Sequence, residues 1–392
     1  MIKKAVETVA PFKDMTDFIK EAGGEAFKLC FQCGLCETAC PWNRVRSHDR
    51  SFFVRRIVHE AQLGLAAFES EDMWLCVTCR NCVQRCPRGV AIIDVMRAMR
   101  RILIPDGSVP PGLPTLRSTM TSLATVGNPW GQEPKDRANW AKSLGVKEFS
   151  EGTELLYFPC CTTAYDARVQ NVAQATSKIL ANLGVSFGIL GPKENCCGES
   201  VRKLGNEKLF KRLARENIKA FIDNGVKKIL VSSPHCYHSF KNEYPEFKAN
   251  FEVVHISQYL FELINEGRLK FTKEYKKRVT YHDPCYLGRH NGIYDEPREV
   301  LKKIPGLDLI EMADSRENSL CCGGGGGRIW MDTPKGERFS DLRVEQAIEV
   351  GAEVLAVSCP YCMVLLKDSV IAAHKTDVIQ IKDITEIVQE VI

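Results

Sequence analysis

The chain has 392 residues, of which 44% are hydrophobic and 26% charged, a composition typical of globular proteins with room for two or three domains. Its formal net charge of +4 is too small to indicate a nucleic-acid partner, so none is expected. No stretch of about 18 uncharged apolar residues is present, which excludes an obvious spanning helix. The first ten residues lack the apolar core of a secretory signal, so we expect a cytoplasmic protein.

The unusual count is cysteine, with 18 residues arranged in tight clusters. In a short secreted chain this number would indicate disulfides, but this chain is long and its cysteines are closely spaced. The pattern therefore predicts reduced, metal-bound cysteines.

Residues 1–103 contain one cysteine pattern twice, Cys-x2-Cys-x2-Cys-x3-Cys-Pro. This is the spacing of bacterial ferredoxins with two [4Fe–4S] clusters, where the fourth cysteine of each copy binds the other copy's cluster. The rule assigns one cluster to Cys30, Cys33, Cys36 and Cys86, and the second to Cys76, Cys79, Cys82 and Cys40. Zinc is the alternative, because Cys-x2-Cys pairs also form zinc sites, but the repeated spacing favours iron–sulfur clusters.

Residues 104–152 are predicted to be a linker. Positions 104–114 hold four prolines and two glycines, which breaks regular structure. The rest of the segment is polar and partly helical, and the sequence assigns it no chemistry.

Residues 153–392 form an internal duplication, with halves at about 153–250 and 278–370. In each half 35 residues separate a Pro-Cys (Cys160, Cys285) from a Cys-Cys-Gly motif (Cys196–Cys197, Cys321–Cys322). Strands alternate with helical stretches, so parallel α/β halves are expected, with ligands at the carboxyl ends of strands. The predicted fold class is α+β: a helical, ferredoxin-like two-cluster domain followed by a duplicated α/β cysteine-rich domain.

The halves differ after their last matching strand. The second half has Cys359-Pro-Tyr-Cys362, whereas the first has Ser233-Pro-His-Cys236. The second half thus owns five cysteines, more than a cubane with one thiolate per iron can use, which suggests a rearranged cluster open to substrate. The first half matches four of them with Cys160, Cys196, Cys197 and Cys236, and is expected to hold a further [4Fe–4S] cluster that relays electrons. Cys161 has no counterpart in this alignment, and it remains open whether Cys161 replaces the missing ligand.

Two further features flank these cysteines. Five glycines, Gly323–Gly327, follow Cys322, and a loop without side chains is expected to let a cluster or its substrate come close. His235 and His282 precede ligand candidates, and either a proton donor to sulfur or a hydrogen bond to the cluster would suit them. For His235 the role of proton donor in a substrate pocket is favoured, because the residue at its duplicate position, Tyr361, can also donate a proton. For His282 the structural role, a hydrogen bond to the cluster, is favoured.

These motifs resemble the cysteine-rich domain of heterodisulfide reductases. Its fusion to a two-cluster ferredoxin module is similar to the D-type subunit of heterodisulfide reductase and to the catalytic iron–sulfur subunit of the membrane complex linked to sulfite reductase. The resemblance implies that Cys285, Cys321, Cys322, Cys359 and Cys362 bind a noncubane [4Fe–4S] cluster that cleaves or forms a disulfide, either of a small molecule or of a small protein. It also implies a partner such as a membrane cytochrome b subunit or other redox subunits, and a peripheral place on the cytoplasmic face of the membrane.

The departure from that family is Ser233, which leaves one complete five-cysteine motif. A second function class stays open: a non-catalytic electron-transfer subunit of a flavin-linked lactate, glycolate or glycerol-phosphate dehydrogenase, since such subunits share the layout.

Overall fold

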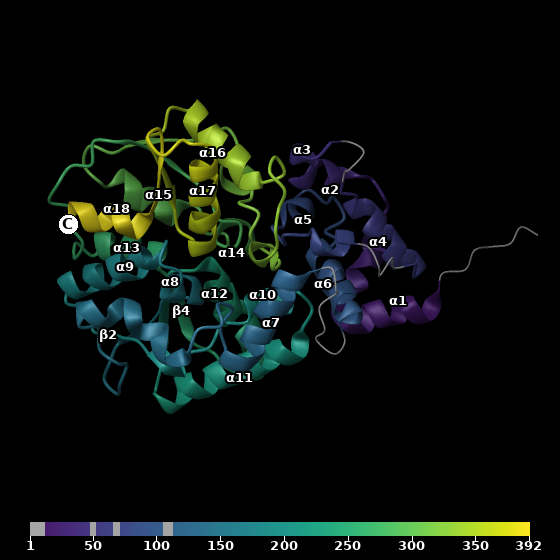
Figure 1. Cartoon of the computed structure of the whole chain (residues 1–392), viewed down its shortest axis with the longest axis horizontal. Helices are drawn as coiled ribbons and strands as arrows, with labels where there is room; N and C mark the ends of the chain where they lie inside the picture. The colour runs from purple at the N-terminus through teal and green to yellow at the C-terminus, as the bar shows by residue number, and fades with distance from the viewer. Residues whose placement is uncertain (1–11, 48–51, 66–70, 105–112) are drawn as a thin grey trace, which may run out of the picture.

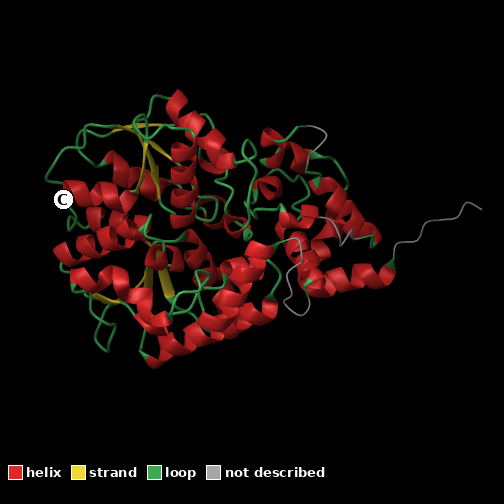
Figure 2. Cartoon of the chain, viewed as in Figure 1, coloured by secondary structure: helices red, strands yellow, loops and turns green. Residues whose placement is uncertain are grey.

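The computed structural model describes residues 12–47, 52–65, 71–104 and 113–392. Figure 1 shows a small helical part, purple to blue, beside a larger part that contains all the strands. In Figure 2 these strands form two groups, each surrounded by helices. The predicted fold class is confirmed, because a helical N-terminal part precedes two parallel α/β halves.

The helical part consists of short elements around the cysteine loops. They are α1 (Lys13–Ile19), η1 (Lys20–Gly24), η2 (Glu25–Leu29), α2 (Leu35–Thr38), α3 (Trp42–Val45), α4 (Val54–Leu63), η4 (Glu71–Trp74), α5 (Asn81–Gln84) and α6 (Ile92–Leu103). The helices α2 and α5 occupy the same place in the two cysteine motifs, and each follows a residue with positive φ, Gly34 and Arg80. Helix α6 contributes most to the apolar core of this part, since Val95, Met96 and Met99 are buried on it.

The larger part has two parallel sheets of the same topology. Their strand orders are β2-β1-β3-β4 and β6-β5-β7-β8. The strands are β1 (Leu155–Phe158), β2 (Phe187–Gly188), β3 (Lys228–Val231), β4 (Glu252–His255), β5 (Arg278–Tyr281), β6 (Asp308–Ile310), β7 (Val354–Val357) and β8 (Gln380–Asp383). Their burial and parallel pairing agree with the apolar runs that the sequence places there.

Helices cover both sheets. The first half has α8 (Cys161–Tyr165), α9 (Gln170–Asn182), α10 (Glu199–Lys203), α11 (Glu207–Asp223), α12 (Pro234–His238) and α13 (Ile256–Asn265). The second has α14 (Gly288–Asn291), α15 (Asp295–Lys302), α16 (Phe339–Glu349), α17 (Pro360–Ala372) and α18 (Ile384–Val391). Short 3-10 and π turns complete them at η6 (Gly191–Lys193), η7 (Ser239–Glu243), η8 (Tyr244–Phe247), η9 (Arg316–Asn318) and η10 (Arg328–Trp330).

The two halves pack on each other with approximate two-fold symmetry. Helix α9 of the first half contacts α18 of the second, and α13 contacts α15 in the reciprocal way. One apolar core therefore runs across both halves and includes Tyr157, Val254, Tyr281 and Ile384. This shared core fixes the carboxyl ends of the two sheets relative to each other.

The segment predicted as a linker is a packed part of the first half. It contains α7 (Pro114–Val126) and η5 (Pro134–Leu144), and Figure 1 shows α7 beside α11. Arg212 of α11 donates to Ala124 O at 2.7 Å, and Cys196 N donates to Gly127 O at 2.8 Å. Residues 113–152 therefore reach the Cys-Cys-Gly loop of the first half directly.

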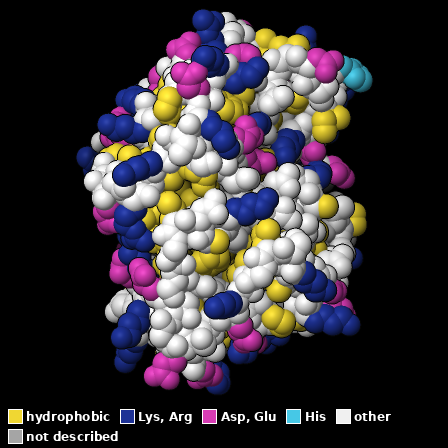
Figure 3. Space-filling view, turned by 90° about the vertical axis from the view of Figure 1, so that its left-hand side faces the viewer, with side chains coloured by type: hydrophobic (Ala, Val, Ile, Leu, Met, Phe, Trp, Pro, Cys, Tyr) yellow, Lys and Arg dark blue, Asp and Glu magenta, His cyan; other side chains and the backbone are white. Residues whose placement is uncertain are grey.

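No helix in the described ranges has both the length and the hydropathy that crossing a bilayer requires. Figure 3 shows the face of the α/β part that points away from the helical part, where basic and acidic side chains are interspersed rather than gathered by sign.

Candidate iron–sulfur centres

The first cysteine set of the helical part lines one small cavity. Cys30, Cys33, Cys36 and Cys86 all contribute to its wall. This grouping of three cysteines from one motif with the fourth from the other is the one that the ferredoxin spacing predicts. Cys33 is exposed, so this site lies at the protein surface. Burial raises the pKa of the Cys36 thiol to about 11, so a nearby cation is needed to hold it as a thiolate at neutral pH.

The second set lies deeper. Cys79 and Cys82 are buried, and the thiolate charges of Cys79, Cys76 and Cys40, the cysteine contributed by the other motif, would act on Cys82. Burial raises the pKa of Cys82 well above its usual range, because a thiolate in an apolar site needs a compensating cation. Closely packed buried thiols without disulfides fit iron–sulfur ligation.

The five cysteines of the second half form a continuous chain of thiol contacts. It runs Cys285–Cys321–Cys322–Cys362–Cys359, and the Sγ atoms of Cys362 and Cys322 are 3.3 Å apart. Strand ends supply the set, since Cys285 follows β5 and the Cys-Pro-x-Cys pair follows β7. All five side chains are buried. The sequence-predicted second-half site is therefore assembled by the fold.

His282 has its ring orientation fixed by an arginine. The Nε of Arg343 donates to His282 Nδ1 at 3.2 Å. A guanidinium has no acceptor, so Nδ1 must be the unprotonated nitrogen of the neutral ring and Nε2 carries the hydrogen. His282 also contacts the Cys322 thiol, and this contact falls to Nε2. Burial lowers the pKa of His282, so the ring is neutral, and its buried Nε2, which has no hydrogen-bond partner among the described residues, is the nitrogen left to face the Cys322 thiol.

His235 comes from the first half but faces the cysteines of the second. Its Nδ1 is 3.0 Å from Glu199 Oε2, and the ring also contacts the Cys359 thiol. Tyr286 and Tyr361 lie against the ring, at centroid distances of 4.2 and 4.5 Å. Burial opposes a charge on His235, but Glu199 and Cys359 outweigh it and raise the pKa of the imidazole to about 10.

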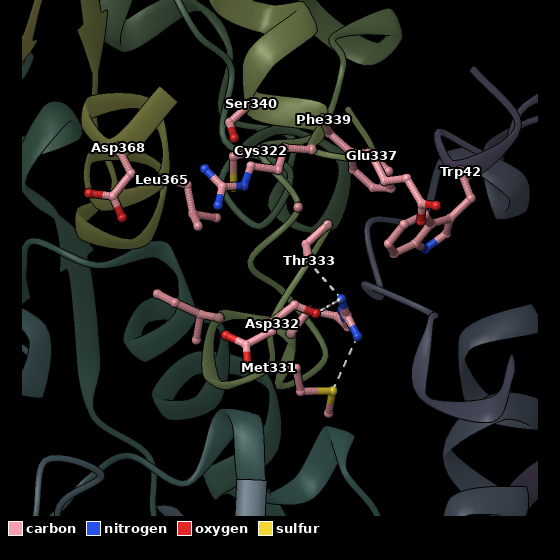
Figure 4. A pocket seen from close by; sticks show the side chains of 14 residues that line it. Trp42, Cys322, Met331, Asp332, Thr333, Glu337, Phe339, Ser340, Leu365 and Asp368 are labelled. Atoms are coloured by element: carbon pink, nitrogen blue, oxygen red, sulfur yellow. Dashed lines mark hydrogen bonds between the residues drawn. The ribbon is translucent and has the colours of Figure 1, made fainter. Parts of the chain in front are cut away.

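A cavity of about 190 Å³ leads from the surface to Cys322 and Gly323. Figure 4 shows Cys322 at its inner end, Leu365 and Asp368 of α17 on one side, and Trp42 of the helical part on the other. Arg328 also lines this cavity and donates to Thr333 Oγ1 at 2.7 Å. Burial, with Arg100 and Arg46 nearby, lowers the pKa of Arg328 to about 10.

The glycine loop packs mainly against the helical part. A Cβ on Gly325 would lie 2.2 Å from Val77 O, and one on Gly326 would lie 2.4 Å from Cys76 O. Arg100 of α6 joins the two segments, donating to Gly326 O at 3.1 Å and to Cys76 O at 2.9 Å. The expectation that the loop makes room for substrate holds at most for Gly323, which lines the cavity. Gly325 and Gly326 let the loop approach the backbone of the helical part, whereas Gly324 and Gly327 face the side chains of Leu365 and Leu204.

This approach brings two cysteine sets into contact. The Cys79 thiol of the second helical-part site contacts the Cys321 thiol of the second half. The second helical-part set and the second-half set are therefore direct neighbours in the fold, and the relay expected of the first half stays a prediction.

The five cysteines of the first half are also brought together. Their contacts run Cys161–Cys196–Cys197–Cys236–Cys160, and all five are buried. Arg137 from η5 donates to Cys161 Sγ at 3.2 Å and to Glu194 at 2.8 Å. Residues 104–152, which carry no recognisable chemical motif, thus contribute a charged side chain to this site.

An unpartnered guanidinium nitrogen beside each set supports the presence of an anionic group. Arg137 Nη2 and Arg289 Nη2 are buried and have no hydrogen-bond partner among the described residues. Arg137 lies next to Cys161, while Arg289 lies near Cys79, Cys285 and Cys321. A buried N–H donor without an acceptor is costly, so these two nitrogens fit sites that hold thiolate-bound clusters of net negative charge.

Sequence reasoning missed the groups that support the cysteines. Arg137, Arg343 and Arg100 are distant along the chain from the residues that they touch, and Arg289, although it follows Cys285 by four residues, donates to Cys79 O across the domain boundary. Glu199 alone carried a signal, since it follows a Cys-Cys-Gly motif directly.

Comparisons with known proteins agree with this geometry. The family described as "Cysteine-rich domain" matches residues 155–241 and 279–367, and the family described as "4Fe-4S dicluster domain" matches residues 26–90. The D-type subunit of the dihydromethanophenazine:CoB–CoM heterodisulfide reductase of Methanosarcina barkeri is 34% identical over 82% of this chain and 78% of its own length. The chain belongs to the family of iron–sulfur proteins that includes this subunit. It is an iron–sulfur protein, as predicted.

Two bacterial relatives are more similar but longer. The "Probable iron-sulfur-binding oxidoreductase FadF" of Bacillus subtilis is 42% identical over 82% of this chain, and the "EtfAB:quinone oxidoreductase" of Syntrophomonas wolfei is 38% identical over 81%. The matched region is 46% of each of these relatives, so the chain spans about half of their length.

Proposed function

We propose that the chain is an oxidoreductase subunit that reduces or forms a disulfide at the second-half site. The observation that carries this proposal is the cavity ending on Cys322, within a five-thiol set that also contacts Cys79 of the helical part. The same group of residues thus offers a place for a substrate and a neighbouring redox site.

The assignment of ligands is part of the proposal. Cys285, Cys321, Cys322, Cys359 and Cys362 would hold a noncubane [4Fe–4S] cluster, and the two helical-part sets would hold cubanes. When bound, such clusters carry single electrons, and one with five thiolate ligands supplies an iron at which a sulfur can be held. In the overall reaction a disulfide takes up two electrons and two protons and becomes two thiols. The reverse reaction oxidises two thiols to a disulfide and releases two electrons and two protons.

The protein groups around the site suit this chemistry. The cavity of about 190 Å³ is smaller than the roughly 300–1,000 Å³ of most ligand pockets, so it suits a low-mass thiol or the side chain of a protein cysteine. Trp42 and Phe339, with ring centroids 4.7 Å apart, help to keep one wall of it apolar. The neutral His282 ring lies beside the Cys322 thiol, and His235, whose Nδ1 is 3.0 Å from Glu199 Oε2, would offer a proton next to Cys359.

Partner subunits are proposed as the source of electrons. A heterodisulfide reductase subunit and a "Probable membrane-anchored ferredoxin" of Chromohalobacter salexigens, 34% identical over 92% of this chain and 59% of its own length, are among the relatives. Their names support redox partner subunits at a membrane. A cytochrome b or other subunit as the electron donor, on the cytoplasmic side, is part of the proposal and rests on the family resemblance.

A second candidate function is electron transfer without bond chemistry. The name of the Syntrophomonas relative, an EtfAB:quinone oxidoreductase, motivates this candidate, because that name describes electron exchange between EtfAB and a quinone. In that case the cavity at Cys322 would have no thiol substrate.

The test is electron paramagnetic resonance of anaerobically purified protein, oxidised with and without a low-mass thiol. We expect a paramagnetic signal that requires thiol and is lost in Cys322→Ala. Cys197→Ala is the matched control, because it alters the same motif in the other half and should keep the thiol-dependent signal. A wild-type protein that contains its iron but shows no thiol-dependent signal would contradict disulfide chemistry and leave electron transfer as the function.

A further inference from the structure

The register of the two sheets changes the pairing of cysteines between the halves. In the first sheet Tyr157 pairs with Leu230, and in the second Tyr281 pairs with Ala356. Leu230 and Ala356 each lie two residues before the serine that ends the strand, Ser232 or Ser358. Tyr157 is therefore the equivalent of Tyr281.

Counting from this tyrosine identifies the equivalent of Cys285. Cys285 lies four residues after Tyr281, and the residue four after Tyr157 is Cys161. The segment between Cys161 and Cys196 is one residue shorter than the segment between Cys285 and Cys321. The equal spacing of 35 residues that paired Cys160 with Cys285 is therefore a coincidence. Contacts agree with the register, because Cys161 touches Cys196 just as Cys285 touches Cys321.

Cys160 then occupies the remaining place in the set. In the second half the last thiol of the chain is Cys359, which contacts Cys362. In the first half Cys160 contacts Cys236, the equivalent of Cys362, and also touches Ser233, which stands at the Cys359 position. Cys160, which follows β1, thus supplies a thiol close to Ser233, the position after β3 where the second half has Cys359.

The backbone of Cys160 is strained in the way this placement requires. Its φ is 78° and its ψ is 149°, a region that residues other than glycine rarely adopt. Such strained conformations persist only where the surrounding structure enforces them, most often at functional sites. The residue at the equivalent position of the second half is Pro284, whose ring forbids this φ.

We infer that the first half is itself a complete five-thiolate iron–sulfur site, in which Cys160 supplies the thiolate that Cys359 supplies in the second half. Its ligands are Cys160, Cys161, Cys196, Cys197 and Cys236. The inference replaces the expected four-cysteine cubane of the first half, and it does not depend on which reaction the second half performs.

The test removes the fifth thiol and then returns it to the position of Cys359. Cys160→Gly deletes the thiol while suiting the backbone, so the fold is expected to persist. Iron analysis should fall by about four atoms per chain, or the Mössbauer spectrum of that cluster should change if it survives with four thiolates. The double variant Cys160→Gly/Ser233→Cys should restore both the iron content and the spectrum.

Two further variants distinguish the ligand sets. Cys161→Ala should alter the iron content or the spectrum as Cys160→Gly does, whereas Ser233→Ala should change neither. Unchanged iron and spectrum in Cys160→Gly or in Cys161→Ala would overturn the inference, because one of the two cysteines would then be a spectator. Loss of iron in Ser233→Ala would also overturn it, by showing an oxygen ligand at the position that Cys160 is inferred to replace. The signals of the helical-part clusters serve as the internal control for folding.

Discussion

The two halves of the cysteine-rich domain share their sheets and differ in what covers their Cys-Cys-Gly loops. In the first half residues 113–152 lie over the loop, and Arg137 from this segment reaches Cys161. In the second half a cavity reaches Cys322, and the glycine loop packs on the helical part. A duplicated site thus became one covered and one accessible site through its surroundings, while the thiol contacts of the two sets stayed alike.

The loops themselves carry part of this difference. Counted from the paired cysteines, Glu199, Ser200 and Val201 of α10 correspond to Gly324, Gly325 and Gly326. Glu199, Ser200 and Val201 carry side chains that fit a helix. A Cβ on Gly325 or Gly326, by contrast, would collide with the backbone of Val77 or Cys76. Only the second half can therefore approach the helical part closely at this loop.

The broadest effect, on stability and on electron exchange between the domains, is expected from Gly326→Ala. The new Cβ would lie 2.4 Å from Cys76 O at a φ of +61°, so we expect overpacking and backbone strain to destabilise the protein by about 2–5 kcal/mol. Electron exchange between the helical part and the second half should slow, while the first-half cluster should be unaffected. Rapid-freeze spectroscopy and the apparent melting temperature measure the two consequences.

Gly336→Ala is the matched control for that change. Its φ is +86°, but no atom lies within 4 Å of the added Cβ, so only the backbone cost of about 1–2 kcal/mol applies. Equal loss of electron exchange in both variants would show that loop strain, rather than contact with Cys76, is responsible.

The covered half is tested next by Arg137→Met. The substitution leaves Glu194 buried without its cation, and breaking one side of a buried pair costs about 3–5 kcal/mol. Burial already raises the pKa of Glu194, so the added substitution Glu194→Gln should recover much of the loss. We expect a lower melting temperature and changed first-half spectra in Arg137→Met, with the thiol-dependent signal of the second half retained. A change confined to the second half would contradict the assignment of Arg137 to the first site.

The smallest effect concerns pH and has opposite signs in the two halves. His255 ends β4 and caps α13, while Asp383 ends β8 and caps α18. Burial lowers the pKa of His255 to about 3, so the stability it contributes is present above about pH 6.5 and falls as the pH drops. Burial raises the pKa of Asp383 to about 7, so its contribution is present below about pH 4 and is lost as the pH rises through 7.

Melting curves between pH 5.5 and 8.5 check these signs. Asp383→Asn keeps an N-cap oxygen and should raise the melting temperature by an amount that grows as the pH rises to 7 and stays constant above it, whereas His255→Asn should remove part of the decline below pH 6.5. Parallel pH profiles of wild type and Asp383→Asn would contradict the assigned pKa of Asp383.

Much of the site was predictable because ligand cysteines are local in sequence. The spacing in Cys30–Cys40 and Cys76–Cys86 predicts their grouping, since three ligands within one short loop can reach one cluster. The Cys-Cys-Gly motifs and the strands before Cys285 and Cys359 likewise predict which thiols meet, because parallel strands end at one edge of a sheet. His235 could be singled out from its duplicate position, Tyr361, although only the structure shows the ring reaching the opposite half.

The fold class, the iron–sulfur chemistry and the inventory of thiols follow from the residue pattern alone, because each depends on short-range spacing and periodicity. The correspondence between the two halves required the folded chain: spacing paired Cys160 with Cys285, whereas strand register pairs Cys161 with it. Register is set by hydrogen bonds between strands distant in sequence, and a loop can gain or lose a residue without disturbing it. The buried arginines and the contact of Gly326 with Cys76 are long-range in the same sense, since their partners are brought together only when the domains pack.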